Sequence, residues 1–455
     1  MSTLQSINPY TGEINAEFET LNLDEVNKKI KTAHTAYLSW KETSNSYKKE
    51  LFLKLADVLE ADIKECARLE TIEMGMLNIA SKTGLQKTVG LIRWFANNFE
   101  EILHGEKEYE TEGLKVKEYY DPIGVIFGIA PWNSPFNQLL RAAVPNILAG
   151  NTQIYKHSSS VPMTAIKIQE LFNKAGFPEG VYTNLFINPR LSEDIISNKL
   201  VAGVNLTGSE GAGSSVGALA GKYLKPCVLE LGGNDAFLVL QDSDLEKITD
   251  LAVTGRIRNG GQACNSSKRF LVPEDKYDEF LNIYKQKMEA LKIGDPMNEN
   301  TQIQPLSTKK AVLEIEKQVQ KAIDSGAKLI TGGKAIDLEK CLFPATILAN
   351  VTKQVTSFNE EIFGPVASVM KYKTIEEAIE LANATDFGLS ATVHGNNLEE
   401  AKKVASKLEG GMIFINNIAG SRASLPFGGV KKSGYGKENG PDGLKAFTNK
   451  KVVII

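Results

Sequence analysis

The first hundred residues carry apolar positions at helical spacing. Within residues 24–42, Val26, Ile30 and Ala33 recur every three or four positions, which predicts an amphipathic helix. The helical pattern continues through about residue 103. Residues 105–120 instead alternate polar and apolar side chains, so extended structure is expected there.

From residue 123 onward, strand-like and helix-like runs alternate. The run IGVIFGIAP, residues 123–131, is almost continuously apolar, as are strands buried on both faces of a parallel sheet. A helix is predicted over 137–150, where Pro145 should kink or divide it. The strand TQIYK follows, then a helix over 162–175 that ends at Gly176. With the further strands VYTNLF and VAGVNL, this rhythm predicts a doubly wound α/β sheet.

A second α/β series follows residue 264. It comprises RFLVP, a helix through about residue 290, KLITGG, VASVMKY, a helix near 375–383 and GMIFINN. The tail FTNKKVVII is a β-rich apolar run with no turn after it. Because an exposed strand of this kind promotes aggregation, we expect the tail to pair with another segment or another subunit.

Composition narrows the class of protein. The chain has 455 residues, 42% hydrophobic and 24% charged, which is typical of a globular protein of several domains or subdomains. Its net charge of −3 gives no basic excess for binding nucleic acid. The N-terminal MSTLQSINPYTGE has no apolar signal-peptide core, and no apolar run reaches membrane-spanning length. We expect a cytoplasmic protein that acts without membrane or nucleic acid.

The four cysteines lie far apart along the chain, at Cys66, Cys227, Cys264 and Cys341. They form no CxxC pair and no disulfide framework, so reduced thiols in a reducing compartment are expected. The four histidines are scattered and none lies near Cys264 in sequence. No Cys/His cluster indicates a metal, and no metal is expected.

Three residues form a candidate reactive group. Cys264 follows Gly260-Gly261-Gln262 rather than the apolar neighbours of an ordinary buried cysteine, and its glycines would let a ligand approach. Glu230 ends an apolar strand-like run in VLELGGN, and Asn133 ends another in APWNSP. Alone, Glu230 could equally be half of a structural ion pair. Together, a thiol, a carboxylate and an amide donor supply what acyl chemistry through a thioester needs.

Six motifs carry a resemblance to a known family. They are APWNSP (130–135), LTGSEGAG (206–213), LELGG (229–233), GQACNSSKR (261–269), EEIFGP (360–365) and LPFGGVKKSGYG (425–436). In this order, and with Cys264 34 positions after Glu230, they resemble the NAD(P)-dependent aldehyde dehydrogenase superfamily over essentially the whole chain.

The resemblance implies a domain layout. An NAD(P)-binding domain would comprise residues 1–103 and 124–231, and a catalytic domain residues 232–435. Residues 104–123 and 436–455 would form a small β extension that bridges subunits in a homodimer or homotetramer. Each of the two larger domains would be a doubly wound α/β unit.

The resemblance also implies roles for the reactive group. Cys264 would attack an aldehyde, and Asn133 with the Cys264 backbone N–H would hold the resulting oxyanion. Hydride transfer would leave a thioester, and Glu230 would activate the water that hydrolyses it. The required chemistry is consistent with these residue types, because a thiolate is the reactive form of cysteine and oxyanion donors stabilise such transition states.

Cofactor contacts follow from the same match. Trp132 would line the cleft, Gly208 and Ser209 would place a helix N-terminus against the pyrophosphate, and Glu361 and Phe363 would hold the nicotinamide ribose and ring. Read alone, GSEGAG could equally be a plain glycine-rich turn.

The stretch after Lys156 bears on the choice between NAD and NADP. The superfamily often reads Lys-Pro-Ser-Glu here, and its Glu binds the ribose hydroxyls of NAD. This chain instead has Lys156 followed by His157, Ser158 and Ser159. A 2′-phosphate would meet no carboxylate and would find Lys156 nearby, so NADP is slightly favoured over NAD.

Two arginines and a serine indicate the substrate class. Arg141, Arg258 and Ser421 fall where succinate-semialdehyde dehydrogenases of the superfamily grip the distal carboxylate. Arginine suits this task because its guanidinium is always charged and binds carboxylates bidentately. Each could instead be a surface or helix-packing residue. The second cysteine found near the nucleophile in some of these enzymes is absent, since Asn265, Ser266 and Ser267 follow Cys264, so no redox switch between neighbouring thiols is expected.

Several alternatives stay open at this level. The substrate could be another semialdehyde, such as glutarate semialdehyde, or an aliphatic aldehyde. A CoA-acylating enzyme is less consistent with Glu230. A non-redox cysteine hydrolase would need a histidine brought to Cys264 by folding, and a binding or structural protein would have no use for the intact reactive group.

Overall fold

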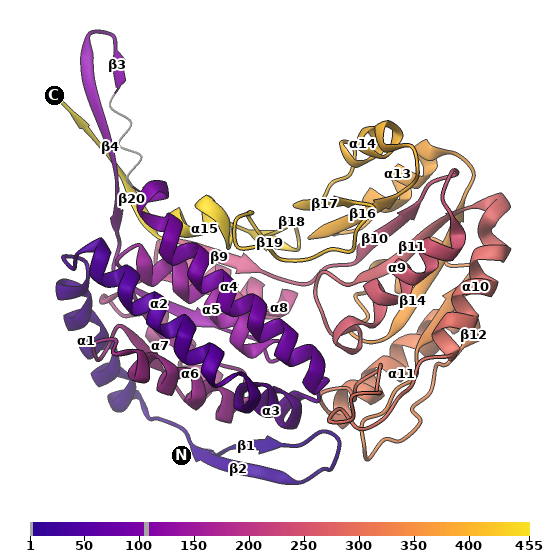
Figure 1. The fold of residues 1–455 in the computed structure, drawn as a ribbon, viewed down its shortest axis with the longest axis horizontal. Helices are drawn as coiled ribbons and strands as arrows, with labels where there is room; N and C mark the ends of the chain where they lie inside the picture. The colour runs from indigo at the N-terminus through magenta and orange to yellow at the C-terminus, as the bar shows by residue number, and fades with distance from the viewer. Residues whose placement is uncertain (1–2, 104–108) are drawn as a thin grey trace.

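The computed structural model describes residues 3–103 and 109–455. Two α/β lobes lie side by side in a crescent, and a β extension projects from the first lobe (Figure 1). Each lobe is built on a largely parallel sheet with helices packed against it, so the predicted pair of doubly wound units is confirmed.

The first lobe is built on a sheet whose strands are parallel except at one edge. In spatial order the strands are β19 (Gly434–Tyr435), β9 (Cys227–Glu230), β8 (Val201–Thr207), β5 (Val125–Ile129), β6 (Thr152–Lys156) and β7 (Tyr182–Asn184). The predicted apolar strand is β5, and its first four residues are fully buried. This burial explains why its sequence lacks the alternation of a half-exposed strand.

Helices surround this sheet. They are α1 (Leu23–Trp40), α2 (Asn45–Ala61), α3 (Ile63–Met74), α4 (Asn78–Leu103), α5 (Pro135–Leu148), α6 (Pro162–Ala175), α7 (Ser192–Ser197) and α8 (Glu210–Lys222). Asn22 and Glu25 form a capping box at the start of α1. Helix α6 ends, as predicted, where Gly176 adopts a left-handed conformation with φ 88°.

Of the two effects expected of Pro145, a kink or a division of the helix after β5, the division is wrong. Helix α5 is continuous from Pro135 to Leu148, with Pro145 inside it. Proline removes one backbone donor and crowds the preceding turn. Here it stands in the last turn, where its own carbonyl still accepts a hydrogen bond from Ala149 N. The helix is almost entirely buried, so tertiary packing outweighs the local cost.

The second lobe holds the other large sheet. Its strands lie in the order β12 (Lys328–Thr331), β13 (Thr346–Ala349), β14 (Val366–Tyr372), β11 (Ser267–Pro273), β10 (Asp235–Val239), β16 (Ser390–His394) and β17 (Met412–Ile415). Only β12, at one edge, runs antiparallel to its neighbour. Its helices are α9 (Leu245–Ile257), α10 (Tyr277–Glu289), α11 (Lys309–Asp324), α12 (Thr356–Asn359), α13 (Ile375–Asn383) and α14 (Leu398–Ala405).

The smaller elements include the extension seen at one end of the crescent. Strand β4 (Leu114–Pro122) pairs antiparallel with β20 (Thr448–Ile454) on one side and β3 (Tyr109–Thr111) on the other. The tail was expected to pair with another segment or with another subunit, and in the structure it pairs with another segment, β4. A separate hairpin joins β1 (Thr3–Ile7) to β2 (Ile14–Glu19) near the N-terminus (Figure 1).

After β17 the chain returns to the first lobe. Strand β15 (Phe387–Gly388) pairs with β18 (Val430–Lys431), and β19 then joins the first sheet beside β9. Helix α15 (Gly440–Lys445) packs against α4 and α5, and its Leu444 is buried in the first lobe's core. The expected boundary between the catalytic domain and the bridging segment, between residues 435 and 436, stays a prediction. Strand β19, with which the chain rejoins the first sheet, ends at that boundary.

Among residues 3–103 and 109–455, no helix is both long and apolar enough to cross a membrane.

Candidate active site

The loop that carries Cys264 has an unusual backbone. It leaves helix α9 through the short 3-10 turn Arg258–Gly261, and Cys264 precedes strand β11. Asn259, Gly260 and Gly261 all have positive φ, at 55°, 62° and 74°. An added Cβ at Gly261 would also collide with the backbone of Gly364. The glycines are therefore required by the turn itself, which is a more local reason than the expected approach of a ligand.

A cavity of about 500 Å³ opens beside Cys264. This volume lies within the range of small-molecule sites. Five of the predicted catalytic and substrate residues line it together, namely Asn133, Arg141, Arg258, Cys264 and Ser421. Its remaining walls include residues of α3 and α4, so both lobes contribute. Glu230 is not among the lining residues.

Asn133 lies on the loop between β5 and α5 and is tied to the Cys264 loop. Its Nδ2 donates to Gln262 O at 2.9 Å, which leaves the second N–H of the amide for another acceptor. Asn259 Nδ2 donates to Asn133 O at 2.6 Å, and Gln304 Nε2 donates to Asn259 Oδ1 at 2.9 Å. Sequence reasoning missed Asn259, although the dipeptide Asn-Gly is a turn signal.

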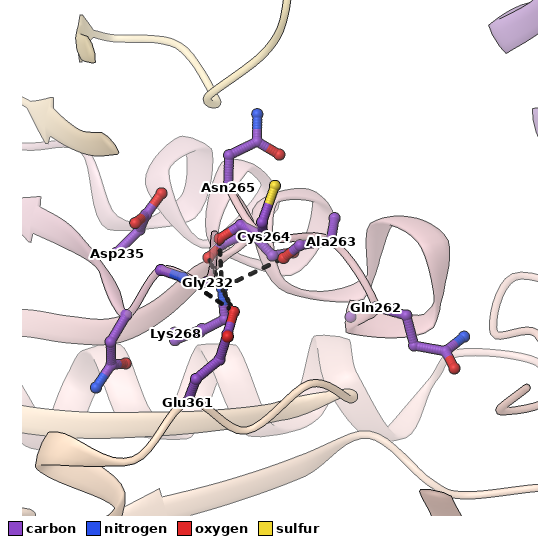
Figure 2. A network of polar contacts seen from close by, with 12 residues as sticks. Gly232, Asp235, Gln262, Ala263, Cys264, Asn265, Lys268 and Glu361 are labelled. Carbon is purple, nitrogen blue, oxygen red and sulfur yellow. Dashed lines mark hydrogen bonds and ion pairs between the residues drawn. The ribbon is translucent and has the colours of Figure 1, made fainter. Parts of the chain in front are cut away.

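Cys264 lines the cavity, and Lys268 holds its loop from the opposite side by hydrogen bonds to the loop carbonyls. Figure 2 shows its sulfur and the Asn265 side chain pointing away from Lys268 and Glu361. Burial raises the pKa of the Cys264 thiol to about 11, and the neighbouring charges of Arg141 and Lys268 oppose this rise. The thiol is therefore protonated at neutral pH in this conformation.

Glu230 ends strand β9 in a buried position with 2% exposure. Neither carboxylate oxygen accepts a hydrogen bond from any residue that the structure describes. Burial, followed by the nearby charge of Glu438, raises the pKa of Glu230 well above its ordinary value, while Arg141 and Lys437 oppose the shift. A carboxyl group with this environment is a candidate for proton transfer near neutral pH.

Arg141 is buried and already paired. Its Nε donates to the carboxylate of Glu438, and its Nη2 donates to Gln138 Oε1 at 2.7 Å. Its guanidinium also stacks over the ring of Phe427 at 4.0 Å. Glu438, which sequence reasoning missed, lies 297 positions away along the chain. The positive charge that Arg141 can offer to a ligand is thus partly neutralised.

Arg258 has a different environment. Its Nη1 donates to Ala419 O at 2.9 Å and its Nη2 donates to Asn265 Oδ1 at 2.7 Å, and both acceptors are uncharged. It has no carboxylate partner within the described ranges of the chain. Burial lowers the pKa of Arg258. The charge of Asp235 acts on Arg258 without a direct ion pair, so this partly buried guanidinium can still attract an anion in the cavity. Nearby, Ser421 Oγ accepts from Asn439 Nδ2 at 2.8 Å.

The predicted nicotinamide contacts lie behind the Cys264 loop. Glu361 Oε1 accepts from Gly233 N at 3.2 Å and pairs with Lys268 Nζ at 3.2 Å. An added Cβ at Gly232 would overlap the Glu361 carboxylate, so this glycine makes room for it. The rings of Trp132 and Phe363 meet edge to face, with 6.0 Å between their centroids. An acidic side chain and two aromatic rings suit the ribose and ring of a nicotinamide nucleotide.

The other predicted cofactor residues lie on the first lobe. Ser209 caps the N-terminus of α8, where its Oγ accepts from Ala212 N, and Gly208 N donates to Glu230 O. Free backbone N–H groups at such a terminus favour an anion. Lys156 ends β6 and donates to His157 O at 3.0 Å, and burial lowers the pKa of Lys156. Ser158 lies within 3.0 Å of Ser160 Oγ, and Ser159 is exposed.

The two lobes present opposite strand ends to the site. Asn133 and Lys156 come at the carboxyl ends of β5 and β6, as the rule for α/β sheets predicts. Cys264 and Glu361 instead come just before β11 and β14. The site thus joins the carboxyl edge of one sheet to the amino edge of the other.

A thiol and an amide donor thus line one cavity between two doubly wound lobes, and a buried carboxyl group ends a strand of the first lobe. The sequence model of the aldehyde dehydrogenase family matches residues 1–453. The chain belongs to the aldehyde dehydrogenase family.

Similar proteins agree with this assignment. The chain is 39% identical over 454 residues to succinate-semialdehyde dehydrogenase [NADP(+)] 1 of Mycobacterium tuberculosis, covering 99% of each chain. It is 40% identical over 448 residues to succinate-semialdehyde dehydrogenase [NADP(+)] of Deinococcus radiodurans, covering 98% of this chain and 94% of that one.

Solved structures match the fold closely. Succinic semialdehyde dehydrogenase from Streptococcus pyogenes, in complex with NADP+, superposes with a TM-score of 0.97 at 37% identity, covering 99% of each chain. An NAD-dependent aldehyde dehydrogenase from Sinorhizobium meliloti superposes with a TM-score of 0.96 at 31% identity, covering 100% of this chain and 91% of that one.

Proposed function

We propose that this enzyme oxidises succinate semialdehyde to succinate with NADP+ as the electron acceptor. The observation that carries the proposal is Arg258, a partly buried guanidinium that bonds only to uncharged acceptors and lines the cavity that holds Cys264. An aldehyde with a carboxylate at its other end would place one group at Cys264 and supply the missing anion to Arg258. The names of the similar proteins support the same substrate.

Cys264, Asn133 and Glu230 would carry the chemistry. The Cys264 thiol would lose its proton to solvent, and the thiolate would then add to the aldehyde carbon, with the new oxyanion held by Asn133 Nδ2 and the Cys264 N–H. A bound nicotinamide supplies the acceptor for the hydride that leaves this carbon. Glu230 then takes a proton from the water that attacks the resulting thioester, which releases succinate and restores the thiol.

Glu230 must move to perform its step. It does not line the cavity, and its carboxylate accepts no hydrogen bond from a described residue. We propose that the side chain turns toward the Cys264 thioester for hydrolysis. In its present position the Glu230 carboxylate is packed against Gly428, where a Cβ would collide with Glu230 Oε1.

The preference for NADP+ rests on the loop after β6. Ser158 and Ser159 stand where a carboxylate would repel a 2′-phosphate. Lys156 has no ion-pair partner in the described chain, so its ammonium group is available to that phosphate. The N-terminus of α8 would accept the pyrophosphate and Glu361 the nicotinamide ribose.

A longer ω-oxo carboxylate such as glutarate semialdehyde is the second candidate substrate. The cavity of about 500 Å³ has room for a longer chain between Cys264 and Arg258. A cysteine hydrolase has no comparable support, because no histidine is among the cavity-lining residues in the described structure.

We propose a homodimer or homotetramer in the cytoplasm. All four cysteines are unpaired, as expected of a reducing compartment. The exposed apolar strand β20 supports contact with a second subunit through the extension.

Absorbance at 340 nm tests the proposed function directly. The wild-type protein is mixed with NADP+ or NAD+ and with succinate semialdehyde, glutarate semialdehyde or butanal, which lacks the carboxylate. We expect kcat/KM to be highest for succinate semialdehyde with NADP+. Equal values for succinate semialdehyde and butanal would contradict the carboxylate assignment, and a hundredfold preference for NAD+ would contradict the cofactor assignment.

A further inference from the structure

Lys268 is a buried cation that no step of the proposed chemistry uses. Its side chain is 3% exposed. Its Nζ donates to three carbonyl oxygens of the nucleophile loop, at 3.2 Å to Ala263, 2.7 Å to Cys264 and 3.2 Å to Ser266. It also pairs with Glu361 Oε1 at 3.2 Å. Figure 2 shows this group of contacts beneath the loop.

The side of the loop on which Lys268 lies is informative. Ala263, Cys264 and Asn265 all line the cavity, but Lys268 does not. The ammonium group therefore pulls the loop carbonyls away from the cavity. In a planar trans peptide, the C=O and the N–H point in opposite directions. A carbonyl of Ala263 held toward Lys268 thus turns the N–H of Cys264 in the opposite direction, away from Lys268.

The Cys264 N–H is also unused. It donates no hydrogen bond to any residue in the described part of the chain. An unpaired N–H beside a reactive thiol is what an oxyanion donor requires before substrate arrives. Its direction matters, because such a donor contributes only when it lies about 2.7–3.1 Å from the developing negative charge.

We propose that Lys268 is a positioning residue that orients the peptide between Ala263 and Cys264 so that the Cys264 N–H serves as an oxyanion donor. The inference rests on the proposed function, since it assumes that Cys264 is the nucleophile. Through Glu361, the same ammonium group links the nucleophile loop to the residue expected to hold the nicotinamide ribose. Lys268 does not line the cavity, so it would act on the aldehyde only through the loop.

The test compares two reactions of the same thiol. Aldehyde oxidation builds negative charge on oxygen, whereas alkylation by iodoacetamide is a displacement at carbon that builds none there. In Lys268→Met, kcat and kcat/KM for succinate semialdehyde at saturating NADP+ should fall together by about 10²-fold, as for loss of one oxyanion donor. The limiting alkylation rate of the Cys264 thiolate at high pH, followed by mass spectrometry of its peptide, should change less than about threefold.

Two further variants complete the experiment. Lys268→Arg keeps the cation and should recover part of the lost kcat, and it also serves if Lys268→Met fails to fold. Lys48→Met is the matched control. Lys48 lies on helix α2, is 4% exposed and packs over the ring of Trp40 on helix α1, and it does not line the cavity. Its kcat should match that of the wild type, which would show that the loss of a buried lysine does not by itself lower kcat.

Three outcomes would overturn the proposal. In the first, oxidation and alkylation fall in parallel, so that Lys268 only keeps the thiol in place. In the second, KM for NADP+ rises while kcat is unchanged, so that Lys268 acts on Glu361 alone. In the third, Lys268→Met keeps full activity. If Cys264→Ala is active, the proposed function fails instead, and the two failures are distinguishable.

Discussion

At the scale of single residues, the two arginines of the cavity have different electrostatic partners. Arg258 bonds only to uncharged acceptors, while Arg141 is paired with Glu438. Both line the same cavity. A substrate carboxylate therefore gains more from Arg258, whose charge is not already neutralised, than from Arg141.

Replacing each arginine by methionine should separate these roles. Arg258→Met should lower kcat/KM for succinate semialdehyde by roughly 30- to 5000-fold, since truncating one partner of a buried charge pair costs about 2–5 kcal/mol. Its kcat/KM for butanal should stay within about threefold of the wild type. Arg141→Met should instead lower the Tm, because it leaves the Glu438 carboxylate buried and unpaired, at a cost of about 3–5 kcal/mol.

Steady-state kinetics with both aldehydes and thermal unfolding check this prediction. The control is Arg190→Met, on the 3-10 turn Pro189–Leu191 of the first lobe and outside the cavity lining. Equal loss of succinate semialdehyde and butanal activity in Arg258→Met would show that Arg258 supports the site rather than the substrate.

We expect the protonation of Glu230 to set the acid limb of the pH profile of kcat. Its raised pKa means that the carboxylate, which is the base, is lost as pH falls through that pKa, so activity should decline on the acid side. Glu438→Gln removes the neighbouring negative charge and leaves Arg141 nearby, and both effects lower the pKa of Glu230. The acid limb of the kcat profile should therefore move to lower pH, by roughly one unit.

Turnover measured from pH 5 to 9 in Glu438→Gln and in the control Glu376→Gln, at the first turn of α13, tests this expectation. The control should keep the wild-type limb. A limb that stays in place or moves upward in Glu438→Gln would mean that Glu230 and Glu438 do not interact, or that another step limits kcat.

The residues that sequence reasoning found and missed differ in a physical way. Cys264, Asn133 and Glu230 stand in motifs whose local context already shows a loop or a strand end. Glu438 acts only through Arg141 and Glu230, far away along the chain, so nothing near it reveals its task. Lys268 lies inside the Cys264 motif, and a cation four residues after the nucleophile was the available signal.

At the scale of elements, periodicity predicted the helices that bury one face, and continuous apolar runs predicted strands buried on both faces, such as β5. Helix α5 is the exception, since burial along its length overrides the local effect of Pro145. Pattern also could not show that Cys264 stands at the amino end of β11 while Lys156 stands at the carboxyl end of β6. That relation depends on how the two sheets meet, which no local pattern encodes.

The loop after β6 allows a prediction at this scale. Ser159→Glu places a carboxylate where the superfamily often has one, on an exposed position that should tolerate it. The charge should repel a 2′-phosphate and bind ribose hydroxyls, so the ratio of kcat/KM for NADP+ to that for NAD+ should fall by roughly tenfold or more.

The matched control for this variant is Ser159→Gln, which has the same side-chain length without the charge. Its cofactor ratio should stay near that of the wild type. If both substitutions change the ratio equally, side-chain size rather than charge decides, and the assignment of this loop to the 2′-phosphate is wrong.

At the scale of the whole molecule, the chain crosses between the lobes more often than the sequence indicates. After β17 in the second lobe it returns to add β19 to the first sheet and Leu444 to the first core. Pairing of β20 with β4 joins residues more than 300 positions apart. Such long-range pairing is set by the complete fold, so the residue pattern could predict that the tail pairs, while only the family resemblance grouped it with residues 104–123.

The extension is also where subunits should meet. Strand β20 lies at the edge of its sheet, and Val452, Ile454 and Ile455 are 51%, 62% and 70% exposed. Apolar side chains on an open edge are covered by a partner in stable proteins. A double variant, Val452→Lys with Ile454→Lys, should therefore lower the mass measured by light scattering at micromolar concentration, toward that of a smaller assembly or the monomer.

The control for this variant is Ile336→Lys, which adds a lysine at another exposed isoleucine, 60% exposed, in the second lobe. It should keep the wild-type mass. The cavity is lined from both lobes of one chain, and no residue of β20 contributes to it, so the separated subunits should retain Cys264 and Arg258 in place. If the double variant keeps the wild-type molar mass, the subunit contact lies elsewhere. If its molar mass falls and its activity is retained, assembly and catalysis are separable.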